Sequence, residues 1–395
     1  MPRIVIIGAG AGGITCAQAL ARSLRPADDI EVVVIDKLAF YYHVVGTPRA
    51  FVESAYTPKL FIPFDNAIPK AAASLVRLER ALVTEISSNE VAFHRINGDD
   101  EKSGEMNKLS FDYLVIATGS WQIAPIKPDI DRYSRSVIEK QFEDLREHIS
   151  KAEKVLVVGG GAVGCEIAAE IKVKFPAKAV TIVESRDKLI ANQALREKFR
   201  DKLNHSLEKL QVRVVLGERL EERLTCNGFE KRTLRTDKGT ELESDVQLLC
   251  AGFRPVTGLV RELDPSLLTE SGFIKVNAQL QVDDDRFRHM FVVGDASNHP
   301  TPKLAYWASE QAKFLAHELI HAIRGGSACK DKFSKPFPKV KAEAMFLPLG
   351  PGGGVGQLPF MGGIVVGDMM VRPIKSKDMM AGMIWGNLGA TLPPA

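Results

Sequence analysis

Cysteine is scarce in this sequence, and its arrangement excludes two classes of protein. The 395 residues contain five cysteines, an odd number, and no Cys-x-x-Cys motif occurs among them. A small secreted domain held by disulfides and a dithiol redox centre both need cysteines in pairs. We expect neither at these scattered positions: Cys16, Cys165, Cys226, Cys250 and Cys329.

An excess of charge of one sign is lacking as well. Lysine and arginine together number 52 against 49 acidic residues, and the formal net charge is +3. So close a balance creates no field that would attract a polyanion, and we expect no nucleic-acid partner. The chain is 45% apolar and 26% charged, which is typical of a globular protein with domains of roughly 150 residues.

Targeting and membrane-spanning segments are also missing. The first apolar run starts at residue 4, which leaves no room for a signal or transit peptide, and residue 2 is proline where N-myristoylation requires glycine. The uncharged run 344–367 contains eight glycines and three prolines, which would break a lipid-exposed helix. We therefore expect a cytoplasmic protein that is not secreted.

A dinucleotide-binding motif opens the chain. In RIVIIGAGAGGITCAQALA, a buried strand precedes a G-x-G-x-x-G pattern, and a small-residue helix follows it. The first glycine allows a tight turn, the second lets the backbone approach a pyrophosphate, and the third allows close helix packing. The next apolar run, EVVVID, ends in a carboxylate that would meet the ribose hydroxyls. The residues expected to bind this dinucleotide are Gly8, Gly10, Gly12, Gly13, Asp36 and Lys37.

The same arrangement recurs in the middle of the chain and predicts a second dinucleotide. KVLVVGGGAVGCEIAAEI places glycines between a buried strand and a helix, and AVTIVES ends in an acid. Glu184 would accept the ribose hydroxyls of NADH and repel the extra phosphate of NADPH, whereas Arg186 would favour that phosphate. NADH is therefore expected, with NADPH as the alternative. The binding residues of this motif are Gly159, Gly161, Gly164 and Glu184.

Three further strand ends carry small or acidic residues. FDYLVIATGS and SDVQLLCAGFRP are buried strands that end in alanine and glycine, and FVVGDAS follows a strand-like segment, NAQLQV. Ligands bind at the carboxyl ends of parallel strands, where an aspartate can meet the ribityl chain of a flavin. These ends add Ala117, Thr118, Gly119, Gly252, Gly294 and Asp295 to the expected cofactor sites.

Together these motifs resemble the two-dinucleotide flavoprotein reductases. Within that class the chain is similar to the ferroptosis-suppressor family, also called apoptosis-inducing-factor-like mitochondrion-associated inducers of death. Stretches along nearly the whole chain carry the resemblance: GCEIAAEIKVKFPAKAVTIVES, RTDKGTELESDVQLLCAGF, TPKLAYWASEQA, GPGGGVGQLP and GDMMVRPIKSKDMM. It implies an α/β fold with two Rossmann-like domains, an FAD domain (residues 1–121 and 254–330) and an inserted NAD(P)H domain (122–253), followed by a small α+β cap (331–395).

The resemblance also implies roles for single residues. Glu166 and Lys375 would lie near the nicotinamide and the flavin, where the lysine would stabilise an anionic reduced flavin. Arg49 would contact FAD, and His43 would lie on the flavin side of the pocket. The backbone of Val83 would lie against the adenine. Without the resemblance, Glu166 fits an acid in the first turn of a helix and Lys375 fits a solvated lysine. His43 then fits a loop histidine whose hydrogen bonds are satisfied, and Val83 fits an ordinary strand residue.

The missing dithiol decides the expected chemistry. Residues 37–60, where disulfide reductases of this class carry a cysteine pair, contain no cysteine. Electrons from the reduced flavin must then pass to a diffusible acceptor, which could be a quinone, a one-electron acceptor or oxygen. The resemblance favours an FAD-dependent NAD(P)H:quinone oxidoreductase with a ubiquinone-type acceptor. Two alternatives stay open: a type II NADH dehydrogenase of a respiratory membrane, and a slow apoptosis-inducing-factor-like redox sensor that binds a partner.

The C-terminal region indicates where an apolar acceptor could enter. After the basic linker KDKFSKPFPKVK, short methionine-rich apolar runs alternate with glycine turns in AMFLPLG, GGIVVGDMMV and DMMAGMIW. Methionine-rich surfaces adapt to varied apolar contacts. We expect peripheral, reversible contact with an intracellular or mitochondrial membrane surface, with a homodimer interface or a plain cap as the alternatives.

One motif is set aside. TPKLAYWASEQAKFLAHELIHAI is expected to form one helix that begins near Pro302, and His317, Glu318 and His321 spell H-E-x-x-H on it. That pattern can bind zinc, but no H-x-x-G-x-x-H extension follows, and the helix already has a place in the flavin fold. We therefore predict no metal site.

Overall fold

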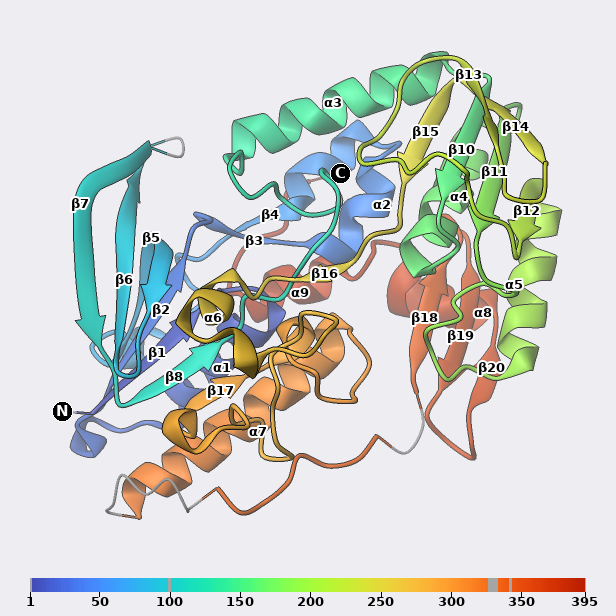
Figure 1. Cartoon of the computed structure of the whole chain (residues 1–395). Coiled ribbons are helices and arrows are strands. Elements are labelled where there is room, and N and C mark those ends of the chain that lie inside the picture. Colours follow the sequence, from blue (N-terminus) through green and yellow to red (C-terminus); the bar gives the residue numbers. More distant parts are fainter. Residues whose placement is uncertain (1, 99–100, 326–332, 341–342, 395) are drawn as a thin grey trace.

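Two α/β units and a C-terminal cap make up the molecule (Figure 1). The computed structural model describes residues 2–98, 101–325, 333–340 and 343–394. Cys329 and part of the basic linker before the cap lie outside the described residues.

The first unit is built on a seven-stranded sheet with the order β17-β8-β1-β2-β5-β6-β7. The members from β17 to β5 run parallel, and β6 and β7 extend the sheet antiparallel. The strands are β1 (Arg3–Ile7), β2 (Glu31–Asp36), β5 (Val76–Ile86), β6 (Glu90–Asn97), β7 (Glu101–Ser110), β8 (Tyr113–Ile116) and β17 (Met290–Val292).

The parallel strands are apolar on both faces because each face is covered. In β1, Ile4 and Ile6 belong to the core with α1 (Ala11–Ser23) and α7 (Ala305–Arg324). Val5 and Ile7 point into a second core, which includes Val260 of α6 (Gly258–Leu263). Successive side chains of a strand point to opposite faces, so a strand that is covered on both sides has no polar face.

The second unit is a four-stranded parallel sheet with the order β12-β11-β10-β15. Its strands are β10 (Lys154–Val158), β11 (Ala179–Glu184), β12 (Val212–Leu216) and β15 (Val246–Leu249), with the hairpin β13 (Arg232–Arg235) and β14 (Glu241–Ser244) beside them. Its helices are α3 (Arg135–Lys151), α4 (Ala162–Lys174) and α5 (Glu197–Lys209).

A short ribbon lies where the chain passes between the two units. Here β9 (Ser120–Trp121) pairs antiparallel with β16 (Arg254–Pro255). We propose the domain boundaries at this ribbon, between residues 121 and 122 and between residues 253 and 254.

The cap contacts both units. Its sheet is formed by β18 (Met345–Pro348), β19 (Gly354–Leu358) and β20 (Ile364–Val366), and it packs against α4 and α5 (Figure 1). The chain continues through α8 (Asp368–Val371), the π-helical turn η8 (Arg372–Ser376) and α9 (Ala381–Asn387). From α9, Trp385 Nε1 donates to the carbonyl of Lys59 at 3.0 Å in the first unit. That part of the first unit contains β3 (Phe40–Tyr42), α2 (Thr47–Ala50), the 3-10 helix η3 (Ser54–Leu60) and β4 (Phe61–Pro63).

The predicted fold class is confirmed, but two local predictions are wrong. Within the segment 277–282, residues 278–280 form a turn, because the Asn277 side chain accepts hydrogen bonds from the amides of Gln279 and Gln281, and Gln281 and Val282 form isolated β-bridges rather than a strand. Helix α7 begins at Ala305 rather than near Pro302, since Leu304 has an extended backbone with φ −131° and ψ 145°.

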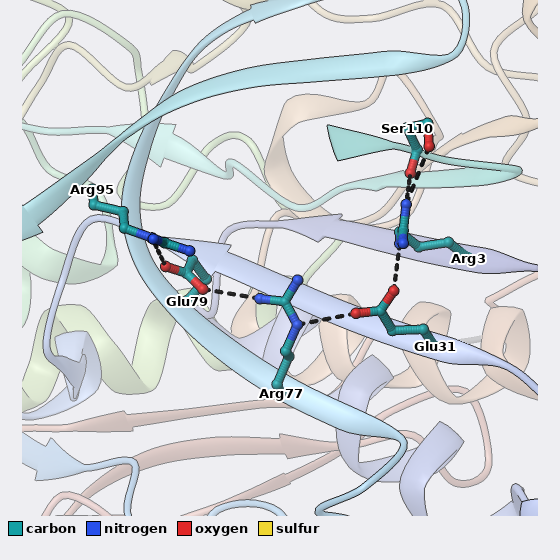
Figure 2. Close-up of polar contacts among 6 residues, drawn as sticks. All are labelled: Arg3, Glu31, Arg77, Glu79, Arg95 and Ser110. Atoms are coloured by element: carbon teal, nitrogen blue, oxygen red, sulfur yellow. Dashed lines mark hydrogen bonds and ion pairs between the residues drawn. The ribbon is translucent and has the colours of Figure 1, made fainter. Parts of the chain in front are cut away.

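An alternating row of charges crosses the first sheet on one side. Figure 2 shows it running over β1, β2, β5 and β6, with contacts of 2.5 to 3.1 Å between neighbours. Its members are Arg3, Glu31, Arg77, Glu79 and Arg95. Burial raises the pKa of Glu31, but the hydrogen bonds from Arg3 and Arg77 outweigh this and leave the pKa lowered.

Replacing Glu31 by glutamine is expected to lower the free energy of unfolding at pH 7 by about 1 kcal/mol. Because the pKa of Glu31 is lowered by folding, its contribution is complete above the unfolded value of about 4.3 and is lost as the pH falls through the folded value. Urea unfolding of wild type and Glu31→Gln at pH 7 and pH 3 measures both. Glu139→Gln, in an exposed helical ion pair with Arg135, is the control. A difference that persists at pH 3 would contradict the ion-pair explanation.

Candidate functional site

The first glycine loop joins β1 to α1 and leaves open space in front of it. Gly8 has φ +98°, a conformation that favours glycine. A Cβ on Gly13 would lie 1.7 Å from the Gly8 carbonyl oxygen, so the helix can pack this closely only with glycine there. A Cβ on Gly12 would lie 3.1 Å from the Val293 side chain, whereas one on Gly10 would meet no atom within 4 Å. The loop is therefore closely packed at Gly12 and Gly13 but has free space beside Gly10. This arrangement suits a pyrophosphate at the start of α1.

Asp36 lies at the end of β2, beside this loop. Its Oδ2 accepts the amide of Ala9 at 2.5 Å, and its Oδ1 accepts the amide of Leu38 at 2.7 Å. Burial raises the pKa of Asp36 even though both amides favour the charged form. Lys37, the next residue, donates to the carbonyls of Asp129 and Ile130, each at 2.9 Å. Val83 lies in the interior of the sheet, next to a shift in register between β5 and β6.

The carboxyl ends of β8 and β17 lie next to each other. Gly119 has φ +70° and a Cβ there would meet no atom within 4 Å, so this end also opens onto free space. Thr118 Oγ1 donates to the Val256 carbonyl at 2.6 Å, and the Ala117 amide donates to the carbonyl of Ile7 at 2.8 Å.

Asp295, which follows β17, interacts with two other polar side chains. The hydroxyl of Ser120 donates to its Oδ2 at 2.6 Å, and Lys127 Nζ lies 3.6 Å from the same atom. Gly294 has φ +76°, and its amide donates to Gln311 Oε1 of α7 at 2.7 Å. Lys127 had not been predicted as a site residue, and no motif in the sequence points to it.

The second glycine loop repeats the geometry of the first. Gly159 has φ +116°, and a Cβ on Gly164 would lie 2.0 Å from the Gly159 carbonyl oxygen. Cβ atoms on Gly161 and Gly252 would meet nothing within 4 Å. Glu184 closes the loop from β11, since its Oε2 accepts the amide of Gly160 at 2.7 Å and its Oε1 accepts the amide of Arg186 at 3.0 Å. Both loops thus fit a dinucleotide.

Four charged side chains form a buried cluster where the two units and the cap meet. Lys375 Nζ donates to Glu166 Oε1 at 2.9 Å and to the carbonyl of Phe346 at 3.1 Å. Arg49 Nε donates to Glu170 Oε2 at 2.7 Å. The two glutamates lie at i and i+4 on α4, one above the other, and both are buried. Two cations, one from α2 and one from η8, therefore face two carboxylates.

Burial dominates the electrostatics of this cluster. It raises the pKa of Glu166, although the ammonium of Lys375 pulls in the opposite direction. It raises the pKa of Glu170 in the same way, against the hydrogen bond from Arg49. Because both carboxylates are buried, their charged forms are stabilised mainly by the cations paired with them.

The cap segment 375–380, which we call the strap, is held against the first unit by three side chains. Each donates a hydrogen bond to one backbone carbonyl of the strap. The bonds are Arg49 Nη2 to Ser376 O at 2.8 Å, Tyr56 Oη to Asp378 O at 2.7 Å and His43 Nε2 to Met379 O at 2.9 Å. A carbonyl oxygen only accepts, so Nε2 of His43 carries the proton. Burial lowers the pKa of His43 to about 4, and the ring is therefore neutral near pH 7. His43 thus contacts the strap that carries Lys375.

Sequence reasoning had missed Glu170. A signal for it existed, since a second glutamate one turn after Glu166 in an otherwise apolar helix must find a buried partner. That partner, Arg49, had been assigned to FAD, and the described contacts of its guanidinium are to Glu170 and the strap.

The cysteines and histidines of the described chain form no centre of their own. Cys16, Cys165, Cys226 and Cys250 are free, and burial raises the pKa of Cys16 and of Cys250 to about 12. Within the described ranges, no group of three or more histidine, cysteine or acidic side chains could hold a metal ion. None of the described helices has both the length and the apolar character needed to cross a bilayer.

Comparisons with known proteins agree with this architecture. The family model for pyridine nucleotide-disulphide oxidoreductases matches residues 2–312. Apoptosis-inducing factor homolog B of Dictyostelium discoideum is 30% identical over 95% of this chain and 94% of its own length. Ferroptosis suppressor protein 1 of Xenopus tropicalis is 31% identical over 99% of this chain and 97% of its own length. Among solved structures, the sulfide:quinone oxidoreductase of Aquifex aeolicus has a similar fold, with a TM-score of 0.74, 15% identity, and coverage of 100% of this chain and 93% of that chain.

These matches confirm the predicted enzyme class and cofactors, an oxidoreductase that uses FAD and NAD(P)H. The similarity to these two curated relatives covers 95% and 99% of this chain, so it includes most of the cap as well as the two α/β units. The chain is thus a member of the pyridine nucleotide-disulphide oxidoreductase family and, within it, of the group that contains ferroptosis suppressor protein 1 and the apoptosis-inducing factor homologues.

Proposed function

We propose that this protein transfers electrons from NADH through FAD to a ubiquinone-type quinone. FAD, when bound, takes up a hydride from the nicotinamide and passes the electrons on. The observation that carries the proposal is the buried Glu166–Lys375 ion pair, in which the cap supplies a cation at the second glycine loop's helix.

The ion pair would serve the reaction through electrostatics. An ammonium group held in a low-dielectric site stabilises negative charge that develops near it. Glu166 Oε1 and the carbonyl of Phe346 fix Lys375 Nζ in place, so that little reorganisation is needed during the reaction. Glu166 would also help to orient the nicotinamide, and His43 would act through the strap.

The thiols support a diffusible acceptor. A disulfide reductase passes electrons through a cysteine pair, and none of the described cysteines is paired. Cys16 and Cys250, with pKa values raised to about 12, remain protonated and weakly nucleophilic at neutral pH. The relative from Aquifex aeolicus is named for its quinone acceptor, which favours a quinone for this chain as well.

The cap carries several exposed apolar side chains. Half of the exposed large apolar side chains in the described chain lie here, and we call them the cap surface: Phe360, Met361, Ile364, Met369, Met370, Ile374 and Met383. Met369 is 90% exposed and Met361 is 85% exposed. The exposed cations Arg372 and Lys377 lie along the same segment, which suits an anionic lipid surface. We propose reversible contact with such a surface, from which an apolar quinone would enter.

Exchanging Met361 and Met369 for serine is expected to weaken sedimentation with vesicles of anionic lipid about tenfold or more. The reason is the loss of two apolar side chains that would be buried in the lipid, each worth about 1.5 kcal/mol or more. Met106→Ser removes a half-exposed methionine from β7 and is the control. Unchanged vesicle binding combined with loss of a dimer in analytical ultracentrifugation would assign the surface to a homodimer interface instead.

Glu184→Ser is expected to raise the ratio of kcat/KM for NADPH to that for NADH about 100-fold. Glu184 would repel the 2′-phosphate of NADPH, and its removal leaves the exposed Arg186 to attract that phosphate. Steady-state kinetics with both nucleotides measure the ratio. Arg186→Gln in the serine background should reverse most of the gain, and a gain that survives this change would contradict the assignment.

Stopped-flow spectroscopy of the purified holoprotein tests the proposed function. The flavin is reduced anaerobically with NADH and then mixed with a short-chain ubiquinone or with air-saturated buffer. Reoxidation by quinone should be much faster than reoxidation by air. Reduced flavin that persists with both acceptors would exclude the quinone reductase and favour a redox sensor. Attachment to membranes that resists high salt would favour a type II NADH dehydrogenase.

A further inference from the structure

We propose that Arg49 and Glu170 are positioning residues, whose buried ion pair holds the strap so that Lys375 lies beside Glu166. The inference rests on the proposed function only in that it gives the Glu166–Lys375 pair a role in oxidising NADH. Neither residue has to touch a cofactor for this role.

The geometry of Arg49 links three separate parts of the chain. Arg49 belongs to α2 of the first unit, its Nε donates to Glu170 on α4 of the second, and its Nη2 donates to the carbonyl of Ser376 in the cap. A guanidinium group is planar and rigid, so these two bonds fix the spacing between α4 and the strap. Ser376 directly follows Lys375 in the chain. The position of the Ser376 backbone therefore determines where the Lys375 side chain can lie.

Charge explains why Glu170 is needed as well as Arg49. Glu166 is one turn away from Glu170, and the charge of Arg49 already acts on it, since Arg49 and Lys375 both oppose the rise in pKa that burial causes. Without Glu170, Arg49 would keep its bond to the Ser376 carbonyl but lose its carboxylate, and its charge would then compete with Lys375 for Glu166. Glu170 engages Arg49 at 2.7 Å, which leaves Glu166 for Lys375 at 2.9 Å.

Stability alone does not account for the arrangement. Arg49 and Glu170 are 7% and 2% exposed, and well-packed apolar residues in place of such a buried pair are often equally or more stabilising. The strap also has backbone strain, since Met379 and Met380 have φ values of 53° and 63°, in the left-handed region that non-glycine residues rarely adopt. Strain of this kind persists where the surroundings force one conformation, as the three side-chain contacts to the strap do here.

The decisive variant replaces both partners, Arg49→Met with Glu170→Met, so that no unpaired charge remains in the core. We expect it to fold with FAD bound and with a Tm close to that of wild type. Hydrogen–deuterium exchange of the strap in the apoprotein should become about 10-fold faster or more, because the donor to Ser376 is lost. Flavin reduction at saturating NADH should slow about 10- to 100-fold, the cost of a misplaced group.

A double-mutant cycle separates positioning from simple damage. In a Lys375→Met background, the Arg49/Glu170 change should have little further effect on the rate, because the group that it positions is already absent. Arg3→Met with Glu31→Met, which removes an ion pair between β1 and β2 of the first sheet, is the control and should change neither the exchange of the strap nor the rate.

Three results would overturn the proposal: wild-type exchange in the strap, an equal loss of rate in the presence and absence of Lys375, or loss of FAD with an unchanged strap. The last would return Arg49 to the cofactor. If the Met/Met variant does not fold, Glu170→Gln with the same exchange and cycle measurements takes its place. None of these results depends on quinone, since NADH reduces the flavin before any acceptor is added. Failure of the quinone reaction would therefore not contradict the positioning role of Arg49 and Glu170. Failure of the positioning role would likewise not contradict the quinone reaction.

Discussion

Exchange of Lys375 for methionine is expected to slow reduction of the flavin by NADH about 100-fold. Glu166 is buried and depends on Lys375 for its charge. Lys375 opposes the effect of burial, so without its ammonium the pKa of Glu166 rises further and the uncharged carboxyl form is favoured. The proposed site then loses the ammonium group and, with it, the support for the charge of Glu166. Removing one preorganised electrostatic group from an active site costs ~3 kcal/mol of transition-state stabilisation, which corresponds to roughly 100-fold in rate.

The matched control for this experiment is Lys377→Met. Lys377 lies on the same strap, two residues further on, but it is exposed and makes no contact like that of Lys375. Anaerobic stopped-flow reduction of both variants, at equal FAD content, gives the comparison. Equal rates in Lys375→Met and Lys377→Met would remove the Glu166–Lys375 pair from the reaction.

Two alanine substitutions in the first glycine loop are expected to fail in different ways. Gly10→Ala should leave the apoprotein as stable as wild type, because the new Cβ meets no protein atom within 4 Å and the backbone, at φ −67°, suits any residue. It should still weaken FAD binding tenfold or more, because the methyl group fills the space that a pyrophosphate needs. Gly13→Ala places a Cβ 1.7 Å from the Gly8 oxygen, so the apoprotein itself should lose several degrees of Tm along with its FAD.

Thermal unfolding of the apoproteins and titration with FAD distinguish these outcomes. The contrast between the two glycines is the informative result, since each variant acts as the control for the other. Equal FAD affinity in Gly10→Ala and wild type would show that the first loop does not hold the pyrophosphate.

The repeated pattern of strand, glycine loop, helix and acid explains why so much of the fold is predictable. Each element depends on residues of the same motif: Gly13 packs on Gly8, and Asp36 at the end of the next parallel strand bonds to Ala9 in the loop. Such local requirements leave a visible pattern of residue types. The segment 277–282 shows the limit of this approach, because side-chain capping by Asn277 overrides an alternating pattern that otherwise favours a strand.

The charged cluster could be predicted only in part, because its members come from distant parts of the chain. Glu166 and Lys375 were found through the family resemblance, whereas no sequence periodicity connects residue 49 with residue 170. The same holds for Lys127, which reaches Asp295 across the fold. Contacts of this kind depend on how the domains pack, and a single sequence carries no local signal for domain packing.

The cap has a consequence for the order of events during synthesis. Both dinucleotide folds are complete in the growing chain before Lys375 leaves the ribosome, and domains generally fold as units, from the N-terminus onward. A nascent chain can therefore form both glycine loops while Glu166 still lacks its cation. The contacts of Trp385 with the carbonyl of Lys59 and of Arg49 with the strap can form only after the cap has been synthesised. Formation of the Glu166–Lys375 ion pair therefore waits for synthesis of the cap.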